Sequence, residues 1–173
     1  MADHLLKAQS SVERPDMRVG QGIDFHEFEN GNGIILCGVK IPHDKKLKGH
    51  SDANAAMHAL TDAILGALGE GDIGTYFPPS DARWKGASSS IFLEKAIAIL
   101  KARNGLIANV DITILAEAPL VGPHVAAMKA LLSPLLQIGI DLIAHKATTT
   151  ANIRAIGRPE CVSAFVPATL RLT

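Results

Sequence analysis

The helix expected over residues 50–62 constrains the fold more than any other segment, because it is apolar almost all the way round. Ser51 or Asp52 is a suitable N-cap, since its side-chain oxygen can accept an unpaired N–H of the first turn. Alanine, leucine and isoleucine fill most of the following positions, so this helix is expected to be buried. One face nevertheless repeats a polar residue at every fourth position, which keeps those side chains in line. The polar stripe consists of Asn54, His58 and Asp62.

Length and composition indicate one domain. The chain has 173 residues, 47% of them hydrophobic, which is enough for a single core. Its 17 basic and 17 acidic residues balance, so neither nucleic acid nor a membrane surface is an expected partner. Residues 1–16 lack an apolar signal segment and are expected to form a flexible arm or linker remnant before a domain over residues 17–173. Cys37 and Cys161 lack C-x-x-C spacing, which favours reduced thiols in a cytoplasmic protein.

Periodicity and turn signals predict a mixed order of strands and helices. Gly20 and Gly22 in the first strand indicate a close backbone approach or a bulge. The turn over residues 29–33 is expected to join the first two strands into a hairpin. The order indicates an α/β or α+β domain with a mixed, four- to five-stranded sheet and helices layered on one face. Strands are expected over residues 17–24, 34–39, 110–114, 142–147 and 162–172, and helices over residues 50–70, 88–104 and 123–139.

One group of residues suits a metal ion. Asp24 and His26 stand two positions apart at the end of a strand, so their side chains point to the same side. Together with His58 they supply one carboxylate and two imidazoles, a set suited to zinc with an open fourth position. Separately, each residue is more typical of a solvated strand end or a core histidine. Their coincidence with the polar stripe favours the metal site.

Two further groups suit phosphate. His50 and Ser51 lie at the expected helix start, where unpaired N–H groups and the helix dipole attract anions. The alternative is an ordinary capped helix N-terminus. Residues 148–150 are three threonines after an apolar strand, whose hydroxyls could donate to phosphate oxygens. The alternative there is a β-branched strand end.

These motifs, in this order, resemble those of the 2-C-methyl-D-erythritol 2,4-cyclodiphosphate synthase family of the non-mevalonate isoprenoid pathway. The resemblance covers residues 17–157. It implies a ferredoxin-like two-layer sandwich and a homotrimer with active sites between neighbouring subunits. The matching motifs are RVGQGIDFH (18–26), HSD (50–52), HALTD (58–62), GDIG (71–74), FP (77–78), NVD (109–111), AEAP (116–119) and KATTT (146–150).

The resemblance also implies an activity and the residues that perform it. The 2-phosphate of 4-diphosphocytidyl-2-C-methyl-D-erythritol 2-phosphate would attack the terminal phosphorus of the diphosphate, giving the 2,4-cyclodiphosphate and CMP. Asp24, His26 and His58 would hold zinc, and magnesium or manganese would accompany the diphosphate. His50 and Thr149 would be catalytic. The implied substrate-binding residues are Asp24, His26, His50, Ser51, Asp72, Ile73, Gly74, Phe77, Asp81, Ala116, Pro119, Thr148, Thr149, Thr150 and Arg158.

The resemblance also implies that some residues of the site belong to an adjacent subunit or to the centre of the trimer. The residues from Ala116 to Pro119, with the threonines, would bind the cytidine diphosphate part from an adjacent subunit. Arg158 would line the central cavity of the trimer or touch phosphate. Some family members are half of a two-enzyme polypeptide, so fusion to, or partnership with, the cytidylyltransferase of the same pathway is also implied.

The chain departs from the family pattern on the magnesium side. Ala151 stands where the family has a glutamate that binds magnesium, and Asn54 stands where it has an aspartate, which predicts one charge less on the chemical face. Residues 153–155 replace a Leu-Gly-Phe segment. We favour an active, slower synthase, because the other functional residues of the family pattern are retained. They are Asp24, His26, His50, Ser51, His58, Asp62, Asp72, Thr148 and Thr149. The alternatives are a catalytically impaired zinc-binding paralogue with a binding or regulatory role, and a zinc-dependent phosphoesterase acting on another substrate.

Overall fold

A five-stranded mixed sheet forms one layer of the computed structural model, which describes residues 17–151 and 160–172. Neighbouring strands are antiparallel except for the last pair, β5 and β6, which is parallel. The sheet confirms the predicted mixed topology, at the upper end of the expected strand number. In spatial order the strands are β4 (Lys45–Leu47), β1 (Met17–Asn30), β7 (Cys161–Leu172), β5 (Gly105–Leu115) and β6 (Ile143–Thr148).

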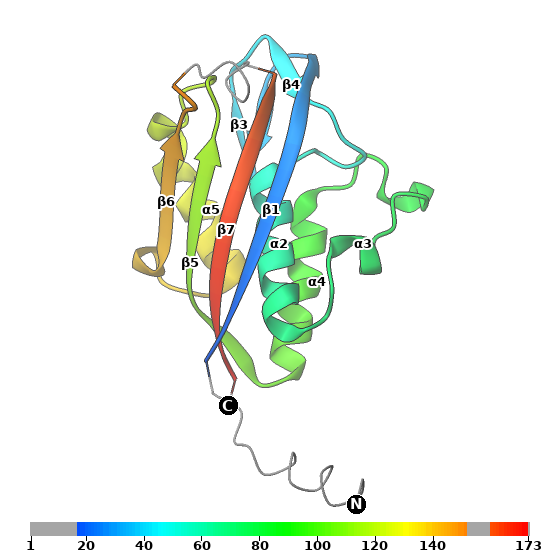
Figure 1. Cartoon of the computed structure of the whole chain (residues 1–173), viewed down its shortest axis with the longest axis vertical. Coiled ribbons are helices and arrows are strands. Elements are labelled where there is room, and N and C mark those ends of the chain that lie inside the picture. The colour runs from blue at the N-terminus through cyan, green and yellow to red at the C-terminus, as the bar shows by residue number, and fades with distance from the viewer. Residues whose placement is uncertain (1–16, 152–159, 173) are drawn as a thin grey trace, which may run out of the picture.

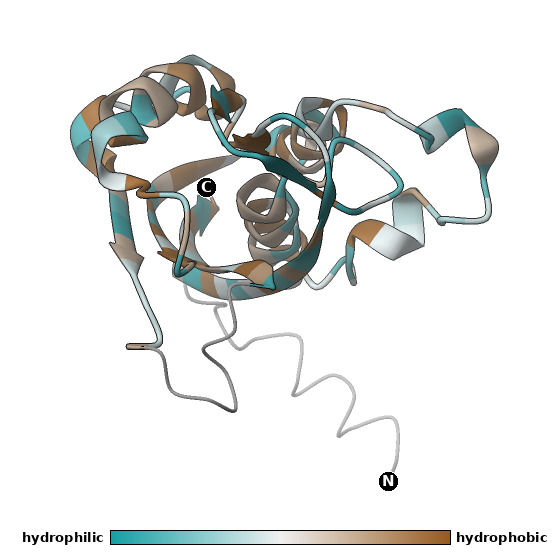
Figure 2. Cartoon of the chain, turned by 90° about the horizontal axis from the view of Figure 1, so that it is seen from above, coloured by the Kyte–Doolittle hydropathy of each residue, from teal (hydrophilic) through white to brown (hydrophobic). Residues whose placement is uncertain are grey.

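Helices form the second layer, all on one face of the sheet. Figure 1 shows α2 (Ala55–Leu68), α4 (Ser89–Ala102) and α5 (Val125–Leu136) behind the strands, and Figure 2 shows the sheet curving around α2. No helix in the described part of the chain is both long and apolar enough to cross a bilayer. The short helical turns are α3 (Ile73–Tyr76), η2 (Ala82–Trp84), η3 (Gly122–His124) and η4 (Ile140–Leu142).

Two glycines let α2 lie directly on β1. A Cβ at Gly22 would lie 1.8 Å from the carbonyl oxygen of Ala59, and one at Gly20 would lie 1.9 Å from that of Ala63. The close backbone approach predicted for these glycines is therefore confirmed. It brings His58, next to Ala59 in α2, close to the strand position two residues after Gly22.

The predicted first hairpin is wrong. Strand β1 continues to Asn30 and pairs with β7 and β4, and the segment expected as one strand folds into its own hairpin of β2 (Ile34–Leu36) and β3 (Val39–Ile41). The reason is a two-residue turn at Cys37 and Gly38, whose φ angles are 49° and 81°. Positive φ at both central residues is typical of a tight hairpin turn that matches strand twist. Cys37 and Cys161 are free thiols, as expected.

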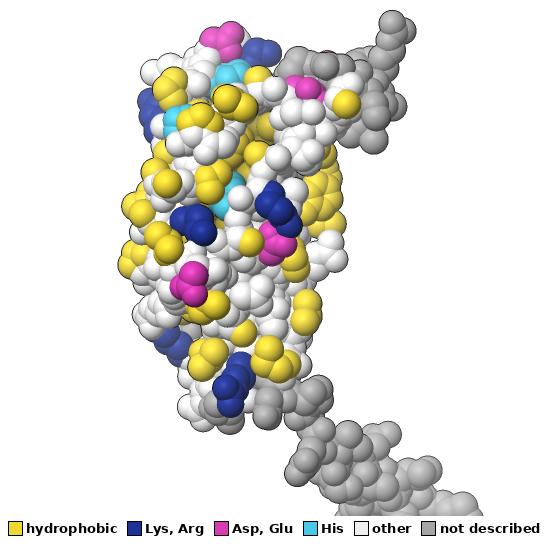
Figure 3. All heavy atoms as spheres, turned by 90° about the vertical axis from the view of Figure 1, so that its left-hand side faces the viewer, with side chains coloured by type: hydrophobic (Ala, Val, Ile, Leu, Met, Phe, Trp, Pro, Cys, Tyr) yellow, Lys and Arg dark blue, Asp and Glu magenta, His cyan; other side chains and the backbone are white. Residues whose placement is uncertain are grey.

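The second face of the sheet is not covered by any described helix. Along β1, side chains alternate between the helix layer and this open face. On the open face Val19 is 71% exposed and Phe25 59% exposed, and Met17, Ile23 and Leu106 are also exposed. Several exposed apolar side chains on one face are typical of a contact with another molecule. By contrast, the edge formed by β6 and α5 mixes hydrophobic side chains with charges of both signs (Figure 3).

Candidate functional site

Three donor atoms converge where β1 passes over α2. The Asp24 Oδ2 atom lies 2.9 Å from His26 Nε2 and 2.9 Å from His58 Nδ1, and the two nitrogens are 3.1 Å apart. All three side chains are partly buried, and one ligand atom from each lies within 4.8 Å of the others. The structure thus brings together the carboxylate and the two imidazoles that the sequence grouped.

The electrostatics of this cluster favour a cation. Burial raises the Asp24 pKa, but the hydrogen bonds and charges of His26 and His58 outweigh burial and hold that pKa well below its usual range. Burial lowers the His26 pKa, but the hydrogen bond to Asp24 and its charge dominate and raise it overall. A carboxylate that stabilises positive charge on its neighbours is suited to a metal ion that replaces their protons.

The outer nitrogens of both imidazoles already have partners. The Nδ1–H of His26 can donate to the carbonyl oxygen of Lys48 at 2.7 Å. The Nε2–H of His58 faces the hydroxyl oxygens of Ser89 at 2.8 Å and Ser51 at 3.1 Å. Outer partners of this kind orient histidines that bind metals. The residues therefore fit a metal ion in chemistry and in orientation.

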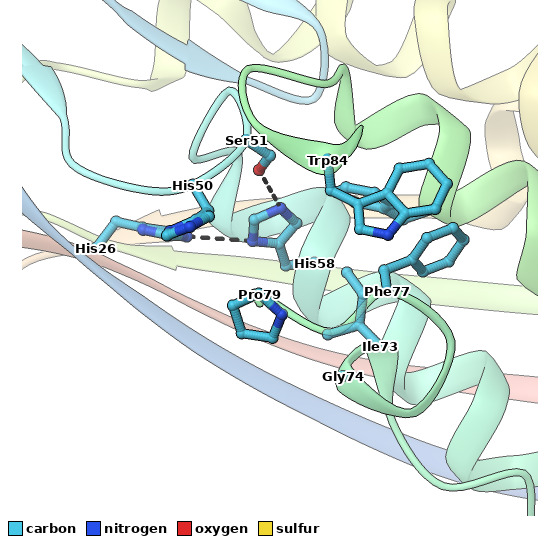
Figure 4. A pocket seen from close by; sticks show the side chains of 10 residues that line it. His26, His50, Ser51, His58, Ile73, Gly74, Phe77, Pro79 and Trp84 are labelled. Atoms are coloured by element: carbon cyan, nitrogen blue, oxygen red, sulfur yellow. Dashed lines mark hydrogen bonds between the residues drawn. The ribbon is translucent and has the colours of Figure 1, made fainter. Parts of the chain in front are cut away.

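A pocket of about 190 Å³ opens beside the cluster (Figure 4). One side is polar and carries His50 and Ser51, and the other is a wall of three aromatic rings. The Phe77 ring centroid lies 4.9 Å from that of Trp84 and 4.6 Å from that of Phe92. Trp84 and Phe92 were not predicted, because no spacing pattern links a loop tryptophan to a helix phenylalanine. The lining residues are His26, His50, Ser51, His58, Ile73, Gly74, Phe77, Pro79, Trp84 and Phe92.

The predicted N-cap of the central helix is wrong. The helix begins at Ala55, and its cap is Asn54, whose Oδ1 accepts the N–H of Met57 at 3.3 Å and that of Cys37 at 3.0 Å. Asn54 is fully buried and does not line the pocket, so its side chain serves as the helix cap.

His50 and Ser51 reach the pocket from the loop that precedes the helix, rather than from its first turn. The backbone turns at Ala53, with φ of 54°, before the helix starts. The helix-dipole argument for phosphate at these two residues is therefore wrong. What remains is an imidazole and a hydroxyl that face the same pocket as the metal cluster.

The third member of the polar stripe anchors a loop. Asp62 Oδ1 accepts the N–H of Ile73 at 2.7 Å, which holds the start of α3 against α2. Burial and the charges of nearby carboxylates raise the Asp62 pKa. The stripe therefore consists of a helix cap, a metal-ligand candidate and a loop anchor. Asp62 was absent from the predicted binding residues, although its place in the stripe was the signal for it.

Two predicted carboxylates do not join the pocket wall in the described segments. Asp72 caps α3, with Oδ1 accepting the N–H of Thr75 at 2.9 Å. Asp81 pairs with Arg83 at 2.5 Å. Ile73 and Gly74, which follow Asp72, do line the pocket. In this chain the segment therefore meets the pocket through an apolar side chain and backbone.

The residues expected to bind cytidine lie on the other face of the sheet. Thr148 is in register with Leu115, and the N–H of Thr150 donates to Glu117 Oε1 at 2.7 Å. The Thr149 Oγ1 atom accepts the N–H of Ala151 at 3.1 Å. Arg158 and residues 153–155 lie outside the described residues. A second hollow on this face is lined by Phe25, Leu115, Ala116, Glu117, Thr150, Cys161 and Ser163, while Pro119 is in the following loop.

Comparisons with curated proteins point to one family. The sequence model of the YgbB family matches residues 17–171. The chain is 52% identical over 170 residues to the bifunctional enzyme IspD/IspF of Brucella suis biovar 1 (strain 1330), covering 98% of this chain and 43% of that protein. It is 55% identical over 156 residues to the bifunctional enzyme IspD/IspF of Mesorhizobium japonicum (strain LMG 29417 / CECT 9101 / MAFF 303099), covering 90% and 38%. The chain thus spans less than half the length of these relatives.

Solved structures share the fold. A 2C-methyl-D-erythritol-2,4-cyclodiphosphate synthase in a CDP-bound form superposes with a TM-score of 0.81 at 38% identity, over 88% of this chain and 99% of that one. The bifunctional IspDF from Campylobacter jejuni superposes with a TM-score of 0.86 at 35% identity, over 91% of this chain and 42% of that one. Matching sequence, matching fold and the converging Asp24, His26 and His58 agree: the chain belongs to the YgbB family.

Proposed function

We propose that this chain converts 4-diphosphocytidyl-2-C-methyl-D-erythritol 2-phosphate to 2-C-methyl-D-erythritol 2,4-cyclodiphosphate and CMP, as a step of isoprenoid precursor biosynthesis. The observation that carries the proposal is the pocket in which a three-residue metal-ligand candidate faces His50 and Ser51, in a chain of the YgbB family. A relative matched over 99% of its length is named for this synthase and was solved in a CDP-bound form.

The metal we propose at Asp24, His26 and His58 is zinc. One carboxylate and two imidazoles are typical of a catalytic zinc site with an open position. When bound, zinc supplies a Lewis acid that polarises a phosphate oxygen. Magnesium or manganese would accompany the diphosphate. Ala151 offers no ligand to that second cation, so we propose that its binding is weakened rather than lost, since magnesium retains several waters.

The reaction needs positioning more than it needs a base. An oxygen of the 2-phosphate forms a bond to the terminal phosphorus of the diphosphate, and the bond from that phosphorus to the bridging oxygen breaks, so that CMP leaves with the electron pair. The attacking phosphate is already anionic at neutral pH. The chain must therefore hold two anions together in line.

The residues of the pocket suit that task. The His50 imidazole and the Ser51 hydroxyl can donate to phosphate oxygens from the polar side. Phe77, Trp84 and Phe92 keep water from the opposite side and contact the carbon skeleton. The Thr149 hydroxyl hydrogen is free to donate, because its oxygen accepts from Ala151. We propose that Thr149 stabilises the transition state from a neighbouring copy.

We propose a homotrimer, because neither hollow suffices alone. The pocket of about 190 Å³ is smaller than the roughly 300–1,000 Å³ of sites that enclose whole ligands of this size. The cytidine-binding candidates lie on the open, apolar sheet face, where another copy can bring them to the metal pocket. The two-enzyme names of the relatives support a further proposal, that the chain works fused to or together with the cytidylyltransferase. We also propose the cytoplasm as its compartment, because both cysteines are free thiols.

A single assay tests the proposal. Purified chain is mixed with the authentic substrate, zinc and magnesium, and CMP and the cyclic product are both followed. We expect the two products in equal amounts, with a change in fluorescence of Trp84, the single tryptophan, when substrate enters the pocket. No CMP release would reject the proposed activity. CMP without cyclic product would favour the zinc-dependent phosphoesterase instead.

A further inference from the structure

A buried serine touches the outer side of the metal cluster. Ser89, the first residue of α4, is fully buried, and its Oγ lies 2.8 Å from His58 Nε2. The same hydroxyl donates to Asp52 Oδ1, and the backbone N–H of Ser89 donates to Asp52 Oδ2 at 3.1 Å. Each carboxylate oxygen of Asp52 therefore accepts one hydrogen bond from Ser89.

This arrangement decides which way the hydrogen bonds run. A carboxylate offers only acceptors, so the hydroxyl hydrogen of Ser89 points to Asp52. The Ser89 oxygen can then only accept from His58, which requires the proton on Nε2. The lone pair of His58 is thereby left on Nδ1, the atom that faces Asp24 at 2.9 Å.

The second histidine has the same kind of support by a different route. The carbonyl oxygen of Lys48 lies 2.7 Å from His26 Nδ1 and can only accept. The proton is therefore held on Nδ1, and Nε2 of His26 faces the cluster. Each imidazole thus has an acceptor behind it that directs its free nitrogen toward Asp24.

Ser51 also reaches His58 Nε2, at 3.1 Å, but its setting differs (Figure 4). Its oxygen accepts the N–H of Ala53 at 3.4 Å, and the residue lines the open pocket. No carboxylate among the described residues fixes the direction of its hydroxyl. Ser51 is therefore available to substrate, whereas Ser89 is buried and its hydroxyl already bonds both Asp52 and His58.

We propose that Ser89, anchored by Asp52, is a positioning residue that holds His58 in the orientation and tautomer required for metal binding. The proposal rests on the metal site proposed above. Ser89 itself touches neither substrate nor metal, so its contribution is to metal affinity. A residue of this kind is typically worth about 10–100-fold in metal affinity.

The test compares two variants of the full chain that have the same shape. Ser89→Thr keeps the hydroxyl, and Ser89→Val replaces it with a methyl group, so that any packing error is shared. We expect Ser89→Val to bind zinc about 10–100-fold more weakly than Ser89→Thr in competition with a chromophoric chelator. In the zinc-loaded protein, we expect the Nε2–H proton of His58 to be protected from exchange in Ser89→Thr and not in Ser89→Val, as read by nitrogen-15 NMR.

Two further variants separate this role from its neighbours. Ser90→Ala removes a hydroxyl one residue away that bonds Ser88 rather than His58, and we expect unchanged zinc affinity. Ser51→Ala should raise the KM for substrate and leave zinc affinity unchanged. Equal zinc affinities and equal His58 spectra for Ser89→Thr and Ser89→Val would overturn the role of Ser89. Failure of the unaltered chain to bind zinc would reject the metal site itself.

Discussion

The two faces of the sheet hold the two halves of the proposed site in different states of completion. On the face covered by helices, Asp24, His26 and His58 already converge within one chain. On the open face, Thr148 and Thr150 lie beside Leu115 and Glu117 with no metal-ligand candidate near them in the described segments. Folding of one chain assembles the metal-ligand candidates, whereas in our proposal a second copy brings the open-face residues to them.

Register shows why one chain cannot join the halves. Asp24 in β1 is in register with Ala164 in β7, which pairs with Ile114 in β5, which pairs with Ala147 in β6. Three strand spacings separate the two ends of this row, about 14 Å. Asp24 points to the helix layer, and Thr148, one residue after Ala147, points to the opposite face. Folding alone therefore keeps the halves apart, which is the argument for sites between copies.

Loss of a metal ligand on the covered face should have the largest effect. We expect Asp24→Ala to remove bound zinc and to lower CMP release by more than the roughly 10–100-fold cost of losing an outer partner. Metal content by mass spectrometry and CMP release by chromatography measure this. Asp44→Ala is the matched control, because the Asp44 side chain is 87% exposed and pairs only with His43 in the described segments. Full activity of Asp24→Ala would contradict the metal site.

Two inactive variants, each altered on a different face of the sheet, should regain activity when they assemble into the same trimer. His58→Ala damages the covered face and Thr149→Ala the open face, and each homotrimer should be inactive. Coexpression should return about a quarter of the sites, because a site then needs an intact covered face from one copy and an intact open face from its neighbour. Product formation by the whole coexpressed population, per mole of chain, measures it. No recovery in mixed trimers would mean that each site lies within one chain.

A charged residue on the open face should dissociate the trimer and leave the metal site of each copy intact. We expect Val19→Asp, at a side chain 71% exposed in β1, to shift the mass in sedimentation from trimer to monomer. Zinc binding should persist, and the stability of the monomeric fold should change by only about 0.5 kcal/mol. Ile91→Asp, at an exposed apolar residue of α4, is the control and should leave the trimer intact. An unchanged mass for Val19→Asp would place the interface elsewhere.

Restoring the family carboxylate should have a smaller effect. Ala151→Glu adds one oxygen ligand next to the threonines, and we expect a lower magnesium concentration for half-maximal rate. Ala151→Gln has the same length and the same backbone demand at φ of 52°, without the charge. The magnesium dependence of CMP release distinguishes the two. An identical dependence for both variants would show that the missing ligand does not matter.

The covered face should also be sensitive to acid. Burial, and then the charge of Lys129, lower the pKa of His145 to about 4 from an ordinary 6.5. Between pH 6.5 and about 4, His145 is therefore protonated in the unfolded chain but neutral in the folded chain. The free energy of unfolding should fall as the pH drops through this range. We expect His145→Gln to lose less of its free energy of unfolding on acidification, measured by denaturant titration with a chelator present. Equal losses in both proteins would exclude His145 as a cause.

Residue type and spacing along the chain predicted those features of the fold that depend on residues close together in sequence. The glycines of β1 predicted the close approach to α2, and the two-residue spacing of Asp24 and His26 predicted their common side. The hairpin failed, because the chain has a tight turn at Cys37 and Gly38 that apolar composition concealed. The helix cap failed because Ser51, Asp52 and Asn54 are equally good caps by residue type. The backbone turn at Ala53 places the helix start after it, so that Asn54 is the cap.

The family resemblance implied the nucleotide role of the threonines, and the sequence by itself determined the candidate groups: one carboxylate and two imidazoles for a metal, and an imidazole and hydroxyls for phosphate. Those choices are readable because strand and helix periods place neighbours in the chain on known sides. Only the tertiary structure decided that Ser89 contacts His58, that Asn54 is buried, and that the two groups of candidate residues lie on opposite faces of the sheet. Contacts between α4 and α2, and between strands far apart in sequence, depend on packing that no local period encodes.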